Sequence, residues 1–199
     1  MRVPALAVLA PAFMVCVVLA GCGAQTPEQD RPDPGAPAKV ETAPNGNQAL
    51  IDATPQVSLT EEQRAQLREL SKGYIDDAAR ENTQGFTAVQ GVEDEVVALQ
   101  PSQVHAWTVQ LTRGQTYRVI GGCDNECTDM DFELLDPTGK IIERDTLPDS
   151  FPILNVSPTT TGAYVVRFVM KTCTIGPCYA AGRLYRQTGS TTVRPSTAA

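Results

Sequence analysis

The chain has 199 residues, with 16 Lys and Arg against 23 Asp and Glu, and its formal net charge is −7. This length has room for one domain of ordinary size and some additional segments. The acidic balance excludes nucleic acid as a partner and argues against anionic lipid surfaces, because both carry negative charge themselves.

The first 21 residues are predicted to be a signal peptide. Arg2 precedes an apolar run, LAVLAPAFMVCVVLA, that is too short for a comfortable membrane span. The run ends in Leu19-Ala20-Gly21-Cys22, which resembles a bacterial lipobox. In lipoproteins the signal peptide is removed before this cysteine, so the resemblance implies that Cys22 is acylated, with palmitate as a typical chain. An ordinary secretion signal with an incidental cysteine is the alternative.

Acylation at Cys22 would anchor the mature chain to a membrane, because attachment through more than one acyl chain is stable. Gly23 follows the cysteine. In Gram-negative lipoproteins the usual retention signal at this position is an aspartate, so the resemblance implies the outer membrane, facing the periplasm.

Residues 22–57 are predicted to form the acylated cysteine and a disordered tether. Prolines are spread through it among Gly, Ala, Gln and Asp: Pro27, Pro32, Pro34, Pro37, Pro44 and Pro55. Few apolar residues are present to offset the entropy of ordering such a segment. The tether would hold the folded part away from the membrane.

An amphipathic helix is predicted over residues 58–82. Ser58–Glu61 and Thr60–Gln63 are overlapping candidates for a capping box. An apolar stripe follows at helical spacing: Leu67, Leu70, Tyr74 and Ala78. This stripe is expected to dock on the following domain, and a helix that binds a partner or a second copy is the alternative.

From residue 90 to residue 187 the hydrophobic period changes to two, which is typical of strands. The side chains expected to point inward are Trp107, Val109, Leu111, Tyr117, Val119, Met130, Phe132, Leu134, Tyr164, Val166, Phe168 and Met170. Turn signals separate the runs, and they indicate an all-β fold, an antiparallel β-sandwich of about eight strands. Residues 188–199 have no periodicity and are predicted to be a disordered tail.

Four cysteines remain once Cys16 leaves with the signal and Cys22 takes lipid: Cys123, Cys127, Cys173 and Cys178. An even number in an exported chain predicts two disulfides. The local pairs Cys123–Cys127 and Cys173–Cys178 are favoured, because each span can close within one turn at the same end of the sandwich. Cross-pairing between the two loops is the alternative. Acidic neighbours disfavour redox catalysis, and an oxidising compartment disfavours a zinc site.

Carboxylates gather around the first cysteine pair, in the stretch CDNECTDMD. Together with two later residues that are expected to reach the same end, the candidate calcium ligands are Asp124, Asp129, Asp131, Asp145 and Asp149, with Asn125 and Glu126 beside them. Six to eight oxygens at one corner is what Ca²⁺ requires. The favoured interpretation is a solvated loop tip stapled by a disulfide, which needs no cofactor.

His105 is the lone histidine, and it is expected to be a partly buried structural residue beside Trp107. Without a second histidine the chain offers no plausible Ser-His-Asp or Cys-His pair. The chain is therefore predicted not to be an enzyme, and a hydrolase built on paired carboxylates is the alternative.

Several short motifs follow one another over residues 92–187. These are Gly114 and Tyr117, Asp129-x-Asp131 followed by Leu134, the turn from Asp136 to Gly139, and Thr161-Gly162-x-Tyr164. Their order and spacing resemble the bacterial pre-peptidase C-terminal domain. The resemblance implies a jelly-roll-like β-sandwich, usually an accessory of secreted peptidases and sometimes a module that binds substrate or calcium.

The sequence thus predicts a lipid-anchored envelope protein that displays a non-catalytic, disulfide-stapled binding or structural module. Its expected partners are the membrane, through the lipid, and an envelope protein or cell-wall material. An accessory or regulator of a secreted peptidase is the alternative function.

Overall fold

The computed structural model describes residues 40–42 and 47–189. The signal peptide, Cys22, much of the tether and residues 190–199 lie outside these ranges. Among the described helices, none combines the length and apolar character that crossing a membrane requires.

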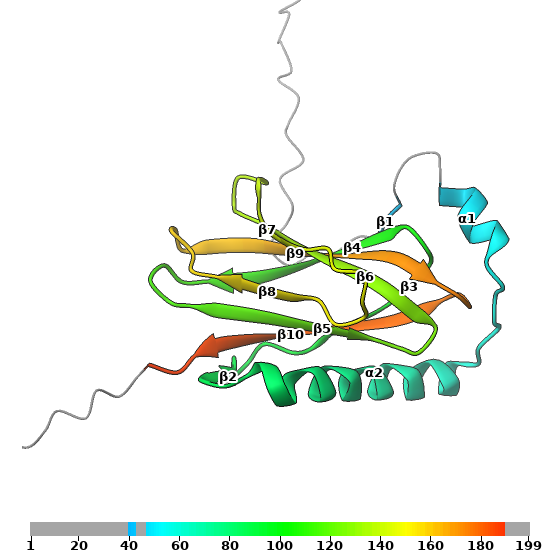
Figure 1. Ribbon diagram of the computed structural model, residues 1–199, viewed down its shortest axis with the longest axis horizontal. Coiled ribbons are helices and arrows are strands. Elements are labelled where there is room, and N and C mark those ends of the chain that lie inside the picture. The colour runs from blue at the N-terminus through cyan, green and yellow to red at the C-terminus, as the bar shows by residue number, and fades with distance from the viewer. Residues whose placement is uncertain (1–39, 43–46, 190–199) are drawn as a thin grey trace, which may run out of the picture. The chain divides into compact units, whose positions relative to one another are not determined.

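Two antiparallel sheets make up the fold (Figure 1). The first has the order β1-β4-β9-β6-β7 and consists of Val40–Thr42, Gln103–Leu111, Gly162–Cys173, Cys127–Leu135 and Ile141–Asp145. The second has the order β2-β10-β5-β8 and consists of Phe86–Ala88, Cys178–Gln187, Tyr117–Cys123 and Ile153–Val156. Strand β3, Glu95–Leu99, pairs with β10 at Cys178–Gly182, while β2 pairs with β10 at Tyr185–Gln187. The predicted all-β class is confirmed, and the short strands β1 and β2 are additions to the predicted set.

The core between the sheets contains the residues that the period-two pattern places inward. Strand β4 buries Trp107, Val109 and Leu111, and the other predicted inward residues of β5, β6 and β9 are buried as well. Phe168 is at the centre, with its ring centroid 4.6 Å from that of Phe132 and 6.3 Å from that of Trp107 in edge-to-face contacts. Aromatic pairs in this geometry add to the stabilisation from burial.

Helix α2, Glu61–Asn82, covers the outer face of the second sheet (Figure 1). Of the two predicted capping boxes the later one forms, because the Thr60 side chain accepts from the Gln63 amide and the Gln63 side chain accepts from the Thr60 amide. The two bonds satisfy amides that would otherwise lack a partner at the helix start. Helix α2 therefore begins two to three residues after the predicted boundary.

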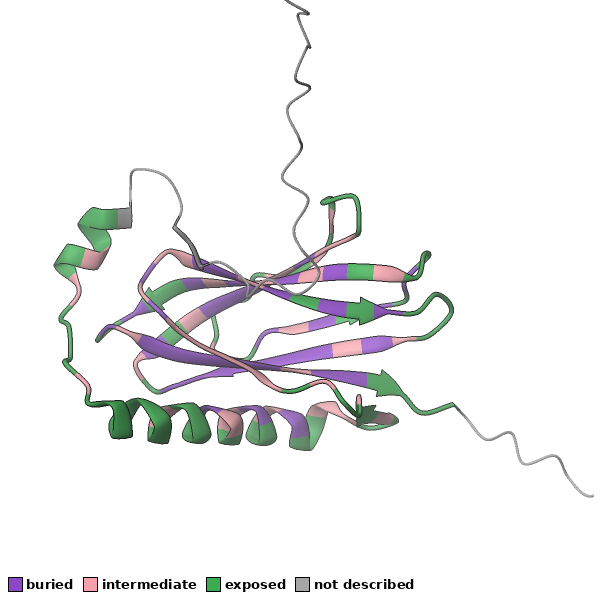
Figure 2. Ribbon diagram, turned by 180° about the vertical axis from the view of Figure 1, so that it is seen from behind, coloured by how far each residue is buried: buried purple, intermediate pink, exposed green. Residues whose placement is uncertain are grey.

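Helix α2 docks on the second sheet as predicted, but its buried stripe is displaced from the predicted one. One side of α2 is buried and the other is exposed (Figure 2). The buried positions are Ser71, Ile75 and Ala79, whereas Leu70 is 61% exposed. Ile75 supplies the large apolar side chain of this face, and the helix backbone comes close to the sheet beside it. A Cβ atom built on Gly122 of β5 would lie 2.9 Å from the carbonyl carbon of Tyr74, so only glycine fits under the helix.

Part of the predicted tether is ordered, so the expectation of disorder over residues 22–57 is wrong for the described residues in it. Strand β1 pairs with Gln103–His105 of β4, and residues Asn47–Ala53 form helix α1. The segment after α1 is held by contacts with a distant loop, which are described below. Contacts of this kind offset the ordering entropy. Thr188, at the start of the predicted tail, is also bound, through its amide and hydroxyl to the Gly85 carbonyl.

Candidate functional site

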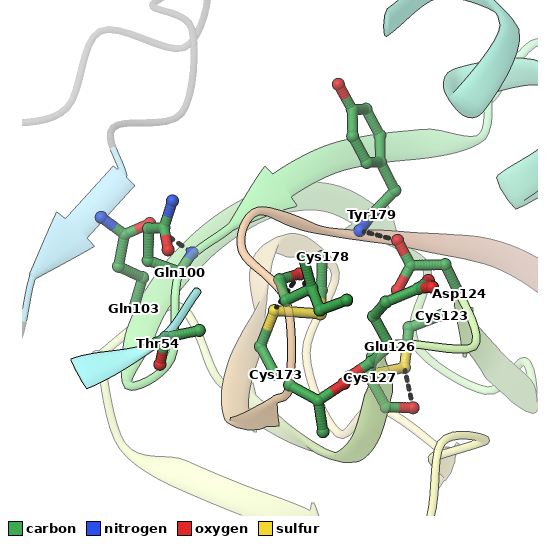
Figure 3. The surroundings of a disulfide bond; sticks show 12 residues. Thr54, Gln100, Gln103, Cys123, Asp124, Glu126, Cys127, Cys173, Cys178 and Tyr179 are labelled. Carbon is green, nitrogen blue, oxygen red and sulfur yellow. Dashed lines mark hydrogen bonds between the residues drawn. A yellow bond between two sulfur atoms is a disulfide. The ribbon is translucent and has the colours of Figure 1, made fainter. Parts of the chain in front are cut away.

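Both disulfides lie at the same end of the sandwich (Figure 3). Cys123 ends β5 and Cys127 begins β6, while Cys173 ends β9 and Cys178 begins β10. Each bonded pair has a Cα–Cα distance of 5.9 Å, and Cys127 stands opposite Cys173 in the β6–β9 register. The structure therefore has the local pairing that the spacing favours, and the cross-paired alternative does not form.

Hydrogen bonds tie the two disulfide loops into one unit. Thr174 donates to the Glu126 carbonyl from its amide at 2.8 Å and from its hydroxyl at 3.0 Å. On the other side, the Asp124 amide donates to the Tyr179 carbonyl at 3.0 Å. The Tyr179 amide returns a bond of 2.6 Å to Oδ2 of Asp124 (Figure 3). Four hydrogen bonds therefore link the two disulfide-bonded regions.

The chain between α1 and α2 supports the second disulfide loop. The Val57 amide donates to the Gly176 carbonyl at 3.0 Å, and the Gly176 amide donates to the Pro55 carbonyl at 2.8 Å. The side-chain amides of Gln56 and Gln100 exchange two hydrogen bonds, of 2.9 and 2.7 Å. A Cβ atom at position 176 would lie 2.3 Å from Oε1 of Gln100, so a larger residue there would displace the paired side chains of Gln56 and Gln100.

A groove of about 440 Å³ lies beside the Cys123–Cys127 disulfide, and we call it the tip groove. Its wall residues come from three elements: Tyr74 of α2, Asp124, Asn125 and Thr128 of the β5–β6 region, and Asp149 and Phe151 of the β7–β8 loop. A volume of this size is within the range of sites that hold a small molecule or a long side chain. It is open on one side to solvent, so a partner's side chain can enter it.

Asp124 is the buried charge of the tip groove, with 7% of the residue exposed. Its Oδ1 atom is buried and has no hydrogen-bond partner among the described residues. Burial raises the pKa of this carboxyl to about 6, and the nearby Glu126 charge adds to the rise, whereas the amides of Tyr179 and Cys127 oppose it. A buried carboxylate oxygen that has no hydrogen-bond donor raises the free energy of the folded state.

The other groove residues combine aromatic surface with negative charge. Burial raises the pKa of the Tyr74 hydroxyl, and the charges of Asp124 and Glu126 raise it further. Phe151 is 42% exposed, and its amide donates to Oδ1 of Asp149 at 2.9 Å. Tyr74 and Asp149 thus line the groove together with Asp124, and the Glu126 charge acts on Asp124 from the same loop.

Only two of the five predicted calcium ligands, Asp124 and Asp149, line the tip groove. Asp145 instead holds the β7–β8 loop, because its carboxylate accepts from the amides of Leu147 at 3.2 Å and Ile153 at 2.8 Å. Asp131 alternates with the inward residues Met130 and Phe132 of β6 and lies on its outer side, and Asp129 lies where the β6–β9 register shifts. Asp131 faces Lys171 at 3.8 Å, and its pKa is raised, mainly by burial.

The five predicted calcium ligands thus do not line a single groove: Asp124 and Asp149 share the tip groove, whereas Asp129 and Asp145 lie close enough to Asp131 to affect its pKa. Within residues 40–42 and 47–189, no three His, Cys, Asp or Glu side chains come together as a metal-binding group. Asp145 and Asp149 accept hydrogen bonds from nearby backbone amides, as aspartates in turns commonly do. Ca²⁺ requires six to eight oxygens, and the calcium site stays a prediction.

His105 has the predicted structural place. It is 6% exposed, its Nε2 lies 2.6 Å from Oε1 of Glu95, and its ring packs edge-on against Phe168. Tyr74 and Phe151 are the groove residues that sequence reasoning missed. For Phe151, an aromatic residue in the polar loop PDSFP was an available signal. For Tyr74 there was none, because its role depends on a strand far away in the sequence.

No family model matches the chain, and no curated protein does. Among solved structures it is similar to PliG of Aeromonas hydrophila, a periplasmic lysozyme inhibitor of g-type lysozyme, at 12% identity and a TM-score of 0.36, over 67% of this chain and 96% of that one. A de novo designed double-stranded β-helix has 15% identity and a TM-score of 0.27, over 47% of this chain and 99% of that one. Likenesses this weak carry no argument about function, and the resemblance to the pre-peptidase C-terminal domain stays a prediction.

Proposed function

We propose that this chain is an exported lipoprotein, anchored through Cys22, whose β-sandwich presents a non-catalytic binding tip at the cell envelope. The observation that carries the proposal is the pair of disulfides at one end of the fold, tied to each other by hydrogen bonds. Disulfides form and persist in oxidising compartments and are rare in the cytosol of most cells. The signal-like segment and Leu19-Ala20-Gly21-Cys22 supply the route and the anchor.

A role in binding, without catalysis, agrees with the chemistry of the tip. Its four sulfurs are oxidised, and its loops are fixed by backbone hydrogen bonds. His105 is engaged with Glu95 in the interior. What the tip offers a partner is an open groove with aromatic walls and a buried carboxylate, which are features of recognition sites.

The test is expression of the full chain with its own signal in a Gram-negative host, followed by fractionation. We expect the mature protein in the outer-membrane fraction, with a lipid-modified N-terminus by intact mass and no thiol that reacts before reduction. The matched variant Cys22→Ala should leave the disulfides intact and release the protein from the membrane. Recovery of the uncleaved wild-type chain in the cytosol with all six cysteines as free thiols would overturn the proposal.

A further inference from the structure

We propose that the free edge of β4 pairs with the same edge of a second copy of this chain, in antiparallel register about a twofold axis at Val109. The proposal concerns self-association, so it goes beyond the proposed anchoring and binding tip and does not depend on Cys22. It follows from three features of β4: backbone groups without a strand partner, a register and length that match those of a second copy, and a neutral sequence.

Strand β4 has a partner along the length of one edge and along only part of the other. Strand β9 pairs with β4 from Val104 to Leu111, whereas β1 pairs with it only from Gln103 to His105. Among the described residues, no strand pairs with the second edge over residues 106–111, which we call the open window. An edge in this state is a template for pairing with another strand.

Thr108 and Gln110 direct their backbone groups toward the open edge. Successive residues of a strand point their N–H and C=O groups to opposite edges. Val109 is 2% exposed, and the Arg113 amide donates to Thr161, which directly precedes β9, so the odd-numbered residues face β9. Thr108 and Gln110 alternate with these residues and are exposed. Their N–H and C=O groups are therefore available to a further strand.

The two residues match each other across a twofold axis. When Val109 lies opposite Val109 of a second copy in an antiparallel pair, Thr108 of each copy lies opposite Gln110 of the other. Opposed residues whose backbone groups face each other exchange both N–H···O=C bonds. The two symmetric pairs therefore use every available backbone group of Thr108 and Gln110 in both copies. A twofold interface requires self-complementarity of this kind.

The open window also has the length that a second copy needs. It begins after His105, which pairs with Val40 of β1, and it ends at Leu111, where the chain enters the turn 112–116. In the twofold register the second copy reaches Thr112, the start of its own turn, opposite residue 106 of the first. Its strand therefore turns away before it meets β1, so the two windows fit each other without displacing either β1.

The sequence of the open window allows two acidic chains to meet there. Residues 106–111 read AWTVQL and include no charged residue, no proline and no glycine. Charged side chains and prolines are common protections of edge strands. Like charges directly opposite each other destabilise a strand pair, and this pairing has none. Two copies of a chain with a net charge of −7 thus have a neutral place to associate.

The experiment uses the full mature chain carrying Cys22→Ala, with both disulfides formed. Sedimentation equilibrium measures its oligomeric state from high dilution up to the highest soluble concentration. We expect a reversible equilibrium between monomer and dimer. A protein that stays monomeric over the whole range would overturn the proposal, and the anchoring through Cys22 would be unaffected by that result.

Two double variants of β4 test the register. Thr108→Lys with Gln110→Lys opposes lysines in both cross-strand pairs and should weaken dimerisation by about tenfold. Thr108→Lys with Gln110→Glu opposes a lysine and a glutamate in the same register and should restore the dimerisation of the parent chain. Gln66→Lys with Gln84→Lys adds the same charge at exposed positions outside β4 and should dimerise more tightly than the first variant. Equal dimerisation of the two β4 variants would refute the register.

Amide hydrogen exchange provides a readout at the contact itself. The amides of Thr108 and Gln110 should exchange slowly in the dimer and fast after dilution to the monomer. The amide of Val109 faces β9 and should exchange slowly at every concentration. Slow exchange of Thr108 and Gln110 in a monomeric protein would show that another segment of the same chain covers the edge, and it would overturn pairing with a second copy.

Discussion

Replacing Asp124 with asparagine should make the folded domain more stable at neutral pH. The wild-type carboxylate is 7% exposed, its Oδ1 lacks a partner among the described residues, and Glu126 is a close like charge. Asparagine keeps the acceptor for the Tyr179 amide and removes the buried charge. Most substitutions of buried residues destabilise a protein, so a gain here would be diagnostic.

The sign and size of this effect follow from the pKa. In the fold the carboxyl titrates at about 6, above its ordinary value of 3.8. The protonated form is therefore favoured by folding, and the stabilisation present below pH 3.8 is lost as the pH rises through about 6. A pKa shift of this size corresponds to a destabilisation of the folded state at pH 7 of at most about 3 kcal/mol. Because solvent in the groove screens the charge, we expect about 1–3 kcal/mol.

Urea denaturation followed by circular dichroism at several values between pH 4 and pH 8 measures the effect. The free energy of unfolding of Asp124→Asn should match that of the wild type near pH 4 and exceed it by about 1–3 kcal/mol at pH 7. Glu81→Gln serves as the control and should show no such pH-dependent gain. The reasoning fails if Asp124→Asn destabilises the domain equally at both ends of this range.

Two further substitutions test how the tip and the helix are held. Gly122→Ala should destabilise the fold by about 1–3 kcal/mol in urea, because the new Cβ meets the backbone of Tyr74 and forces α2 away from the sheet. Gly73 lies in α2, and no atom lies within 4 Å of its Cβ position. Gly73→Ala should therefore stabilise the fold by up to about 1 kcal/mol. If both substitutions have the same effect, the close approach of α2 is not as described. Replacing Cys173 and Cys178 together by serine should cost about 2 kcal/mol, since the loop it opens is short. A double variant that does not fold at all would show that this disulfide does more than close its own loop.

The strands could be predicted because alternation is a local property. The spacing of Trp107, Val109 and Leu111 alone predicts one buried face of β4, and all three residues are buried in the structure. Turn chemistry is equally local. Oδ1 of Asp136 accepts from the amide of Thr138, and Gly139 has a φ of +84°, as the Asp-Pro-Thr-Gly signal indicates. Close pairs of cysteines are local as well, which explains the agreement on the disulfides.

The docking face of α2 could not be predicted, because it depends on the surface that receives it. The helix sequence offers both Leu70 and Ile75 as apolar residues, and the close approach of the helix backbone at Gly122 places Ile75 against the sheet. The buried stripe therefore runs through the smaller residues Ser71 and Ala79. Sequence periodicity ranks side chains by hydrophobicity and contains no information about the distance between the helix backbone and the sheet.

The sequence by itself determined the class of fold, the inward residues of its longer strands and the local cysteine pairs, because each depends on neighbours a few positions apart. Only the tertiary structure decided which carboxylates meet. It separated Asp145 from Asp124 and brought Tyr74 and Phe151 to the same groove. The physical reason is that a site joins segments that are distant along the chain. Backbone amides of these segments donate to some carboxylate oxygens, while Oδ1 of Asp124 has no donor among the described residues.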